Sequence, residues 1–186
     1  TYEDVTNIDS LGIVTARSGI NMSGGQFLVG TGVTIGIAGI ATFRSGRIDV
    51  GDAVYNTSIG EKAGDAYTTG SRNTSVGYGA LTATTTGAYN TAVGMQSLDT
   101  NTTGERNTAV GAYALDANTT ANYNTAIGYQ SLSASTTASA LVAVGYNALA
   151  ANTTGTNNTA VGYEALDACT TGSQNEAFGR SALTNN

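Results

Sequence analysis

Residues 90–106 read NTAVGMQSLDTNTTGER, and residues 107–123, which follow directly, read NTAVGAYALDANTTANY. The pattern extends in both directions with a period of 17 residues and without insertion or deletion. An asparagine opens each repeat, a glycine lies four residues later, and a leucine lies four residues after the glycine. The asparagines are Asn56, Asn73, Asn90, Asn107, Asn124, Asn158 and Asn175, with Leu141 in the one substituted register. The glycines are Gly60, Gly77, Gly94, Gly111, Gly128, Gly145, Gly162 and Gly179, and the leucines are Leu81, Leu98, Leu115, Leu132, Leu149, Leu166 and Leu183.

This period predicts a β-solenoid. Helical-hairpin repeats need about 33 residues or more, and glycine, asparagine and threonine are poor residues for a helix interior. The alternation in Thr91-Ala92-Val93-Gly94 has the period of a strand, with threonine and valine on one face and alanine and glycine on the other. The sequence therefore predicts an all-β fold in which residues 53–186 form a parallel solenoid (β-roll) of eight turns.

The side chains that recur predict how the turns pack. We expect the asparagines to bond to their neighbours in adjacent turns, and the glycines to form tight corners that a Cβ would obstruct. We expect one interior column beside the leucines, consisting of Val76, Val93, Val110, Ile127, Val144 and Val161. The alanine and glycine face would then lie outside, where three chains could pack together as a homotrimer.

Residues 1–52 follow a different pattern. The segment from Gly12 to Gly19 is echoed 27 residues later by the segment from Gly39 to Gly46, with short runs of alternating apolar residues between them. Such strands are too sparse to bury a core within one chain. We therefore predict an N-terminal β-prism or triple β-helix-like segment that intertwines in the trimer. The chain lacks an initiator methionine, and we expect it to be part of a longer protein.

Two portions of the chain resemble known families. The segment from Val5 to Phe43, which includes VTNIDSLGIVTARSGI and GVTIGIAGIATF, resembles a module of marine cyanophage tail-fibre and virion structural proteins. The repeats from Asn56 to Leu183 resemble fibre repeats of the same phages. More distantly, they are similar to the head of trimeric autotransporter adhesins, whose left-handed β-roll repeats carry Asn-Ser-x-Ala-Ile-Gly. The resemblance implies an extracellular virion appendage, other virion or fibre proteins as partners, and no catalytic residues.

Composition argues against several classes of protein. Hydrophobic residues make up 40% of the chain and the net charge is only −6, which is unlike a disordered chain. The chain has no histidine and one cysteine, so we expect no catalytic residues, no cofactor and no metal site, and hence no enzyme. Without a basic cluster or a long apolar run, we expect neither nucleic-acid binding nor membrane insertion.

The aspartates and the single cysteine are the remaining candidates for chemistry. Asp99, Asp116 and Asp167 share one column, and the first two could form a paired-carboxylate site or simply a solvated charged edge. Cys169 lies in a column otherwise filled by polar residues such as Asn152. We interpret it as a small thiol that replaces a polar turn residue.

Aromatic side chains supply the candidate recognition surface. Positions that vary between repeats are expected to point outward, and they include Tyr78, Tyr113, Tyr129, Tyr146 and Tyr163. These tyrosines could stack on host surface glycans, or they could pack against one another along the rod. The column before each asparagine reads Tyr55, Arg72, Tyr89, Arg106 and Tyr123, and predicts a ladder of cation–π contacts.

Three functions remain as hypotheses. The first is a structural shaft segment of a phage fibre that acts as a rigid spacer. The second is a receptor- or glycan-binding adhesin module of a virion or bacterial surface. The third, ice binding, is suggested by recurring Thr-Thr pairs but weakened because these pairs lie beside glycine and asparagine in an apparent turn.

Overall fold

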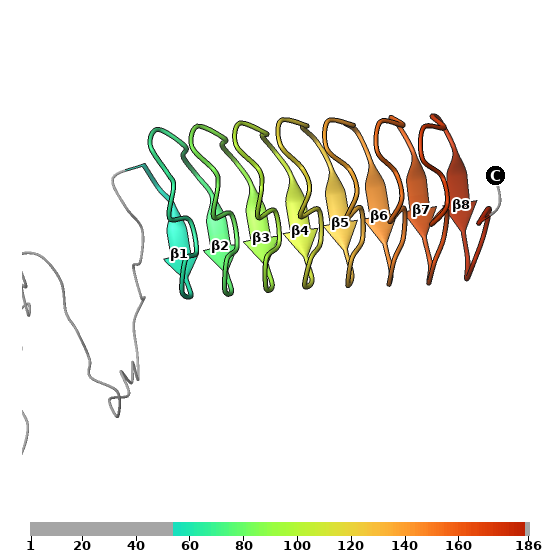
Figure 1. Ribbon diagram of the computed structural model, residues 1–186, viewed down its shortest axis with the longest axis horizontal. Coiled ribbons are helices and arrows are strands. Elements are labelled where there is room, and N and C mark those ends of the chain that lie inside the picture. Colours follow the sequence, from blue (N-terminus) through green and yellow to red (C-terminus); the bar gives the residue numbers. More distant parts are fainter. Residues whose placement is uncertain (1–53, 185–186) are drawn as a thin grey trace, which may run out of the picture. The chain divides into compact units, whose positions relative to one another are not determined.

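The computed structural model describes residues 54–184, which form a coil of stacked turns (Figure 1). Each turn contributes one strand of three residues, and no helix occurs within these residues. The strands are β1 (Thr57–Ile59), β2 (Thr74–Val76), β3 (Thr91–Val93), β4 (Thr108–Val110), β5 (Thr125–Ile127), β6 (Val142–Val144), β7 (Thr159–Val161) and β8 (Glu176–Phe178). The predicted N-terminal segment, residues 1–52, lies outside the described residues.

The eight strands form a single parallel sheet whose order follows the chain from β1 to β8. Each residue pairs with the residue 17 positions later, as Thr91 does with Thr108 and Val93 with Val110. The prediction of a parallel β-solenoid with 17-residue turns is therefore confirmed.

Hydrogen bonds between turns extend well beyond the strands. The backbone N–H of Gly94 donates to the carbonyl of Val76 at the corner after the strand, with a donor–acceptor distance of 2.8 Å. Farther round the turn, Leu98 N–H donates to Ala114 at 3.0 Å and Thr102 N–H to Thr119 at 2.8 Å. Although a strand occupies only three residues per turn, backbone hydrogen bonds thus join each turn to the adjacent turns around its whole circumference.

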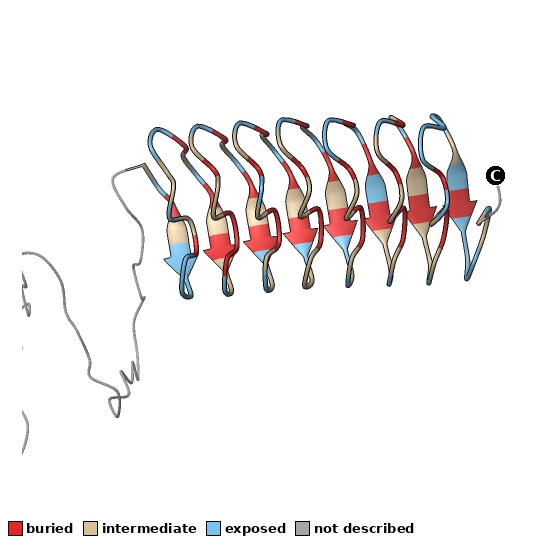
Figure 2. Cartoon of the chain, in the orientation of Figure 1, coloured by how far each residue is buried: buried red, intermediate tan, exposed pale blue. Residues whose placement is uncertain are grey.

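The interior is a narrow column of leucine and alanine. The leucines from Leu81 to Leu166 are fully buried, and so are the central alanines of the strands, such as Ala92 and Ala109. Figure 2 shows this burial as a band through the middle of the strands, with the flanking residues more exposed. Leu183, in the last turn, is 45% exposed. The predicted leucine column is therefore internal from Leu81 to Leu166.

The prediction that the branched residues share this interior is wrong. Val93, Val110 and Ile127 are 37%, 37% and 40% exposed, and the other members of the column, Val76, Val144 and Val161, are only partly buried. The strand residues alternate between two faces as predicted, but the alanine face points inward because leucines from the opposite wall already fill the narrow coil. The alanine face is consequently not available for packing between chains.

The asparagines form the predicted ladder. The Oδ1 atom of Asn90 accepts the backbone N–H of Asn107 at 3.0 Å, and Asn107 Oδ1 accepts that of Asn124 at the same distance. The Nδ2 group of Asn107 donates to the carbonyl of Ala121 at 2.8 Å, near the end of the same turn. Each amide therefore joins adjacent turns and also closes its own turn. Leu141 has no side-chain oxygen, so the ladder is interrupted there.

The constant 17-residue spacing of the corner glycines reflects a backbone that leaves no room for a side chain at these positions. Gly77 has a φ of +129°, and a Cβ placed on it would lie 2.6 Å from the carbonyl oxygen of Gly94. Non-glycine residues avoid such φ values, and the neighbouring turn leaves no space for a methyl group. The predicted glycine corner is therefore confirmed.

Candidate functional site

Four of the five predicted recognition tyrosines contact one another in a row along the rod, which we call the tyrosine row; Tyr129, Tyr146 and Tyr163 are exposed, and Tyr113 is half-buried. Tyr129, Tyr146 and Tyr163 lie on successive turns, with ring centroids 5.5 and 5.1 Å apart and interplanar angles of 12° and 9°. Tyr113 meets Tyr129 edge to face at 6.0 Å. Tyr78 lies apart from the row, beside Lys62, whose Nζ is 5.6 Å from the centroid of the Tyr78 ring.

The faces of these rings are largely occupied. A sugar that stacked between two rings would need roughly 3.5–4 Å of separation from each of them, and the centroids of Tyr146 and Tyr163 are only 5.1 Å apart. The guanidinium of Arg180 lies over Tyr163 at 5.5 Å. The row therefore presents ring edges and hydroxyl groups to solvent, a geometry that favours packing between turns over stacking on a glycan.

Arginine and tyrosine alternate in a second exposed column, as the sequence predicts. The Cζ atom of Arg72 lies 5.4 and 5.3 Å from the ring centroids of Tyr55 and Tyr89, and that of Arg106 lies 5.2 and 5.6 Å from those of Tyr89 and Tyr123. These distances fall within the range of cation–π contact. Each arginine is thus held between two rings, and the predicted ladder is confirmed.

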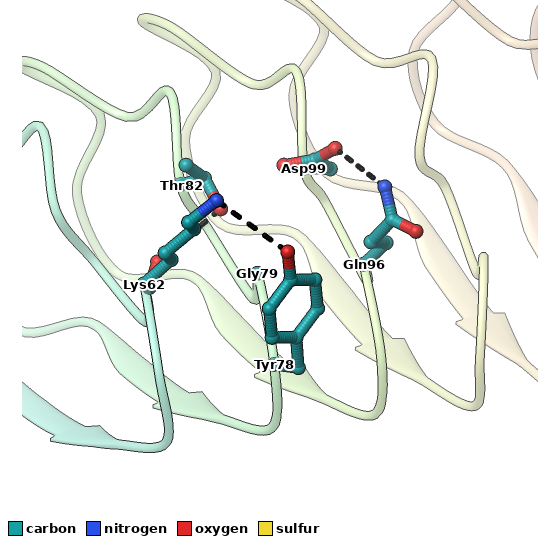
Figure 3. A pocket seen from close by; sticks show the side chains of 6 residues that line it. All are labelled: Lys62, Tyr78, Gly79, Thr82, Gln96 and Asp99. Carbon is teal, nitrogen blue, oxygen red and sulfur yellow. Dashed lines mark hydrogen bonds between the residues drawn. The ribbon is translucent and has the colours of Figure 1, made fainter.

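A small hollow lies among the first turns. It has a volume of about 170 Å³ and is lined by Lys62, Tyr78, Gly79, Thr82, Gln96 and Asp99 (Figure 3). Lys62 Nζ donates to Tyr78 Oη at 3.4 Å, a bond that raises the pKa of Lys62, and Gln96 Nε2 donates to Asp99 Oδ2 at 3.2 Å. Sites for small molecules usually have about 300–1,000 Å³. This hollow could hold a few water molecules, but its size does not suit an organic substrate.

The aspartate column does not behave as a strongly coupled pair. The pKa of Asp116 is raised, mainly because the carboxyl is partly buried, and the charge of Asp99 makes the smallest contribution. The Oδ1 atom of Asp116 is buried without a hydrogen-bond partner. Asp167 lies three turns beyond Asp116, and no group of three potential metal ligands occurs among residues 54–184.

Cys169 occupies the position expected of a polar turn residue. It is buried, and its Sγ lies 3.7 Å from the carbonyl oxygen of Gly172. The same column contains a second buried ladder that we did not predict, in which Asn118 Nδ2 donates to Asn101 Oδ1 at 2.7 Å. Its signal in the sequence is the recurrence of asparagine, serine or threonine just before five of the seven Thr-Thr pairs.

The Thr-Thr pairs lie at bends in the chain, outside the strands. The first threonine of a pair uses its hydroxyl within the rod, because Thr102 Oγ1 donates to the carbonyl of Thr119 at 3.0 Å and Thr153 Oγ1 donates to that of Thr170 at 3.0 Å. These hydroxyls are therefore committed to bonds between turns. The arrangement does not favour a flat hydroxyl array that binds ice.

Two further observations bear on the class of protein: the search for membrane-spanning helices and the comparison with known proteins. Within residues 54–184, no helix has the length and apolar character needed to cross a bilayer. Comparisons with models of protein families, with curated proteins and with solved structures found no match.

Proposed function

We propose that this chain is a structural shaft segment of a phage fibre, which acts in the virion as a rigid spacer for host attachment. The observation that carries the proposal is the hydrogen bonding between turns. It continues from the strand through the glycine corner, the leucine wall and the threonine bend. A protein whose turns are joined around their whole circumference is suited to hold two ends at a fixed separation.

The repeat also provides a simple way to set length. With strands about 4.8 Å apart, eight turns make a rod about 38 Å long, and each added repeat lengthens it by about 5 Å. Bending the rod would stretch bonds such as that from Gly94 N–H to Val76, as well as the bonds of the buried asparagine ladder. Rigidity therefore follows from the same interactions that define the turn.

The virion context comes from the resemblance of residues 5–43 and 56–183 to cyanophage fibre proteins. In that setting the chain forms a parallel homotrimer on the outside of the particle and contacts other fibre or virion proteins. The spacer role needs no reactive group.

An adhesin module is the second candidate, and the tyrosine row is the observation that favours it. Tyr129, Tyr146 and Tyr163 are 43%, 42% and 45% exposed, and tyrosine provides a broad amphipathic surface for recognition. A ligand would contact the ring edges and hydroxyls, because the ring faces are stacked on one another. This constraint makes the spacer the better supported of the two functions.

Binding assays separate the two functions. The purified full chain would be tested on a glycan array and on intact cyanobacterial cells, alongside a variant in which Tyr129, Tyr146 and Tyr163 are all changed to serine. A spacer predicts no binding by either protein. Binding by the natural chain that the serine variant loses would instead establish an adhesin.

A labelling experiment tests the virion context. Gold-labelled antibodies against residues 54–184 should decorate the fibres of cyanophage particles that carry the chain, along the shaft and away from the tip. Labelling confined to a fibre tip would contradict the spacer role.

A further inference from the structure

The outward side of the eight-stranded sheet carries an apolar stripe along the rod. We define the outer strand face as the first and third residues of β1–β8. Its third positions are Ile59, Val76, Val93, Val110, Ile127, Val144, Val161 and Phe178, and its first positions are Thr57, Thr74, Thr91, Thr108, Thr125, Val142, Thr159 and Glu176. We propose that copies of this chain associate laterally through the outer strand face; the inference rests on the proposed trimeric shaft and names its contact surface.

This face exposes side chains that are normally buried. Ile59 is 52% exposed, Phe178 is 68% exposed, and Val93, Val110 and Ile127 between them are 37–40% exposed. The apolar positions follow one another on every turn, so they form one continuous stripe. Scattered apolar residues are usual on a protein surface, but a continuous stripe of this kind indicates an interaction site.

The architecture of the sheet points the same way. Parallel sheets almost always have both faces covered by other parts of the protein. Here one face is covered by the leucines, which pack against the central alanines such as Ala109. The other face is bare in the single chain, although its β-branched residues are the types that favour a buried sheet surface.

A second copy of the same chain is the partner that fits this face best. The stripe repeats at every turn, about 4.8 Å along the axis, and an identical rod matches that spacing over its full length. Glu176 in β8 is the one charged residue on this face within the described strands. Two such faces can therefore meet without repulsion between like charges along most of their length.

The available area is sufficient for association. A strip about 38 Å long and about 10 Å wide, the length of three strand residues, covers roughly 400 Å² per copy. Three copies that close on this face bury roughly 1,200 Å² in total, which reaches the lower limit expected of a specific interface.

Cross-linking of the full chain tests the location of the interface. Cys169 is first replaced by asparagine, the usual residue of its column, with Cys169→Ser as a second background in case the first does not fold. A single cysteine is then introduced by Val110→Cys on the outer strand face or, as the matched control, by Thr120→Cys at an exposed bend of the same turn. A short bismaleimide reagent joins thiols that lie close together, and sedimentation velocity of the natural chain gives its oligomeric state.

If the outer strand face is the interface, Val110→Cys should yield about tenfold more cross-linked chain than Thr120→Cys. The copies of either residue lie at one height around the axis of a cyclic oligomer, but only those of Val110 would face one another across the interface. A natural chain that sediments as a trimer while the control cross-links as well as Val110→Cys would overturn this inference and leave the trimeric shaft intact. A natural chain that sediments as a monomer would overturn both.

Discussion

Replacing Ser135 with asparagine should stabilise the solenoid by completing its second buried ladder. Ser135 Oγ and Asn118 Oδ1 are both buried without a hydrogen-bond partner. In the preceding turns, Asn118 Nδ2 donates to Asn101 Oδ1 at 2.7 Å, and Asn101 Nδ2 donates to the carbonyl of Gly104 at 3.2 Å. An asparagine at position 135 can make the equivalent bonds to Asn118 Oδ1 and to the carbonyl of Ala138.

The expected gain follows from these two bonds. Each contributes about 0.5–1.5 kcal/mol, and ordering the new side chain costs about 1 kcal/mol. The net increase in the free energy of unfolding should be about 1 kcal/mol, which corresponds to a rise in Tm of about 4 °C for a unit of this size. Because the turns repeat, the space around Asn101 and Asn118 shows that the column accommodates an asparagine.

Thermal and guanidinium denaturation of the full chain, at one fixed protein concentration, would measure the change. Thr137→Asn, at an exposed bend two residues away, provides the matched control and should alter Tm by less than the ladder variant. A decrease in stability on Ser135→Asn, or a change equal to that of the control, would refute the reasoning.

Three other experiments test separate parts of the structure. A double-mutant cycle of Arg106→Gln and Tyr89→Leu should give a coupling energy of about 0.5–1 kcal/mol because the guanidinium lies 5.2 Å from the ring, and a coupling of zero in denaturation would remove that contact. Gly111→Ala should lower stability by more than about 2 kcal/mol, because its Cβ would strike the backbone of the next turn, whereas Gly179→Ala meets no neighbour; equal losses would contradict the corner geometry. Asp116→Asn should stabilise the protein at neutral pH. Burial raises the folded-state pKa of this carboxyl, so its cost to stability appears as pH rises through the carboxyl range, and the gain should vanish in acid; a gain that is independent of pH would be inconsistent with this shift.

The sequence was sufficient to predict the 17-residue turn, but not which face of its strand is buried. The period required every 17th residue to share an environment, and this alone predicted the asparagine ladder, the glycine corner and the contacts of Arg106. The alternation of Thr91, Ala92 and Val93 separates two faces, yet it does not say which one is buried. Valine is the more hydrophobic choice, but the leucines of the opposite wall leave room only for alanine.

The backbone conformation of several residues also had no signal in the sequence. Leu115 and Tyr113 adopt φ values of +54° and +59°, which non-glycine residues rarely occupy. Hydrogen bonds to the adjacent turns, such as Leu115 N–H to the carbonyl of Ser131 at 2.9 Å, hold these residues in place. Such bonds depend on turns that lie 17 residues away, so local propensity cannot reveal them.

The length of the rod after removal of whole turns tests the central claim most directly. Deletion of residues 90–123, which span two repeats, joins Tyr89 to Asn124 and keeps every column in register. Cryo-electron microscopy of the full chain and of this variant should show a folded rod that is shorter by about 10 Å. Deletion of residues 90–115, which is not a whole number of repeats, should disrupt the ladders and serves as the control. An unfolded two-repeat variant, or a rod of unchanged length, would contradict the account of this protein as a stack of interchangeable turns.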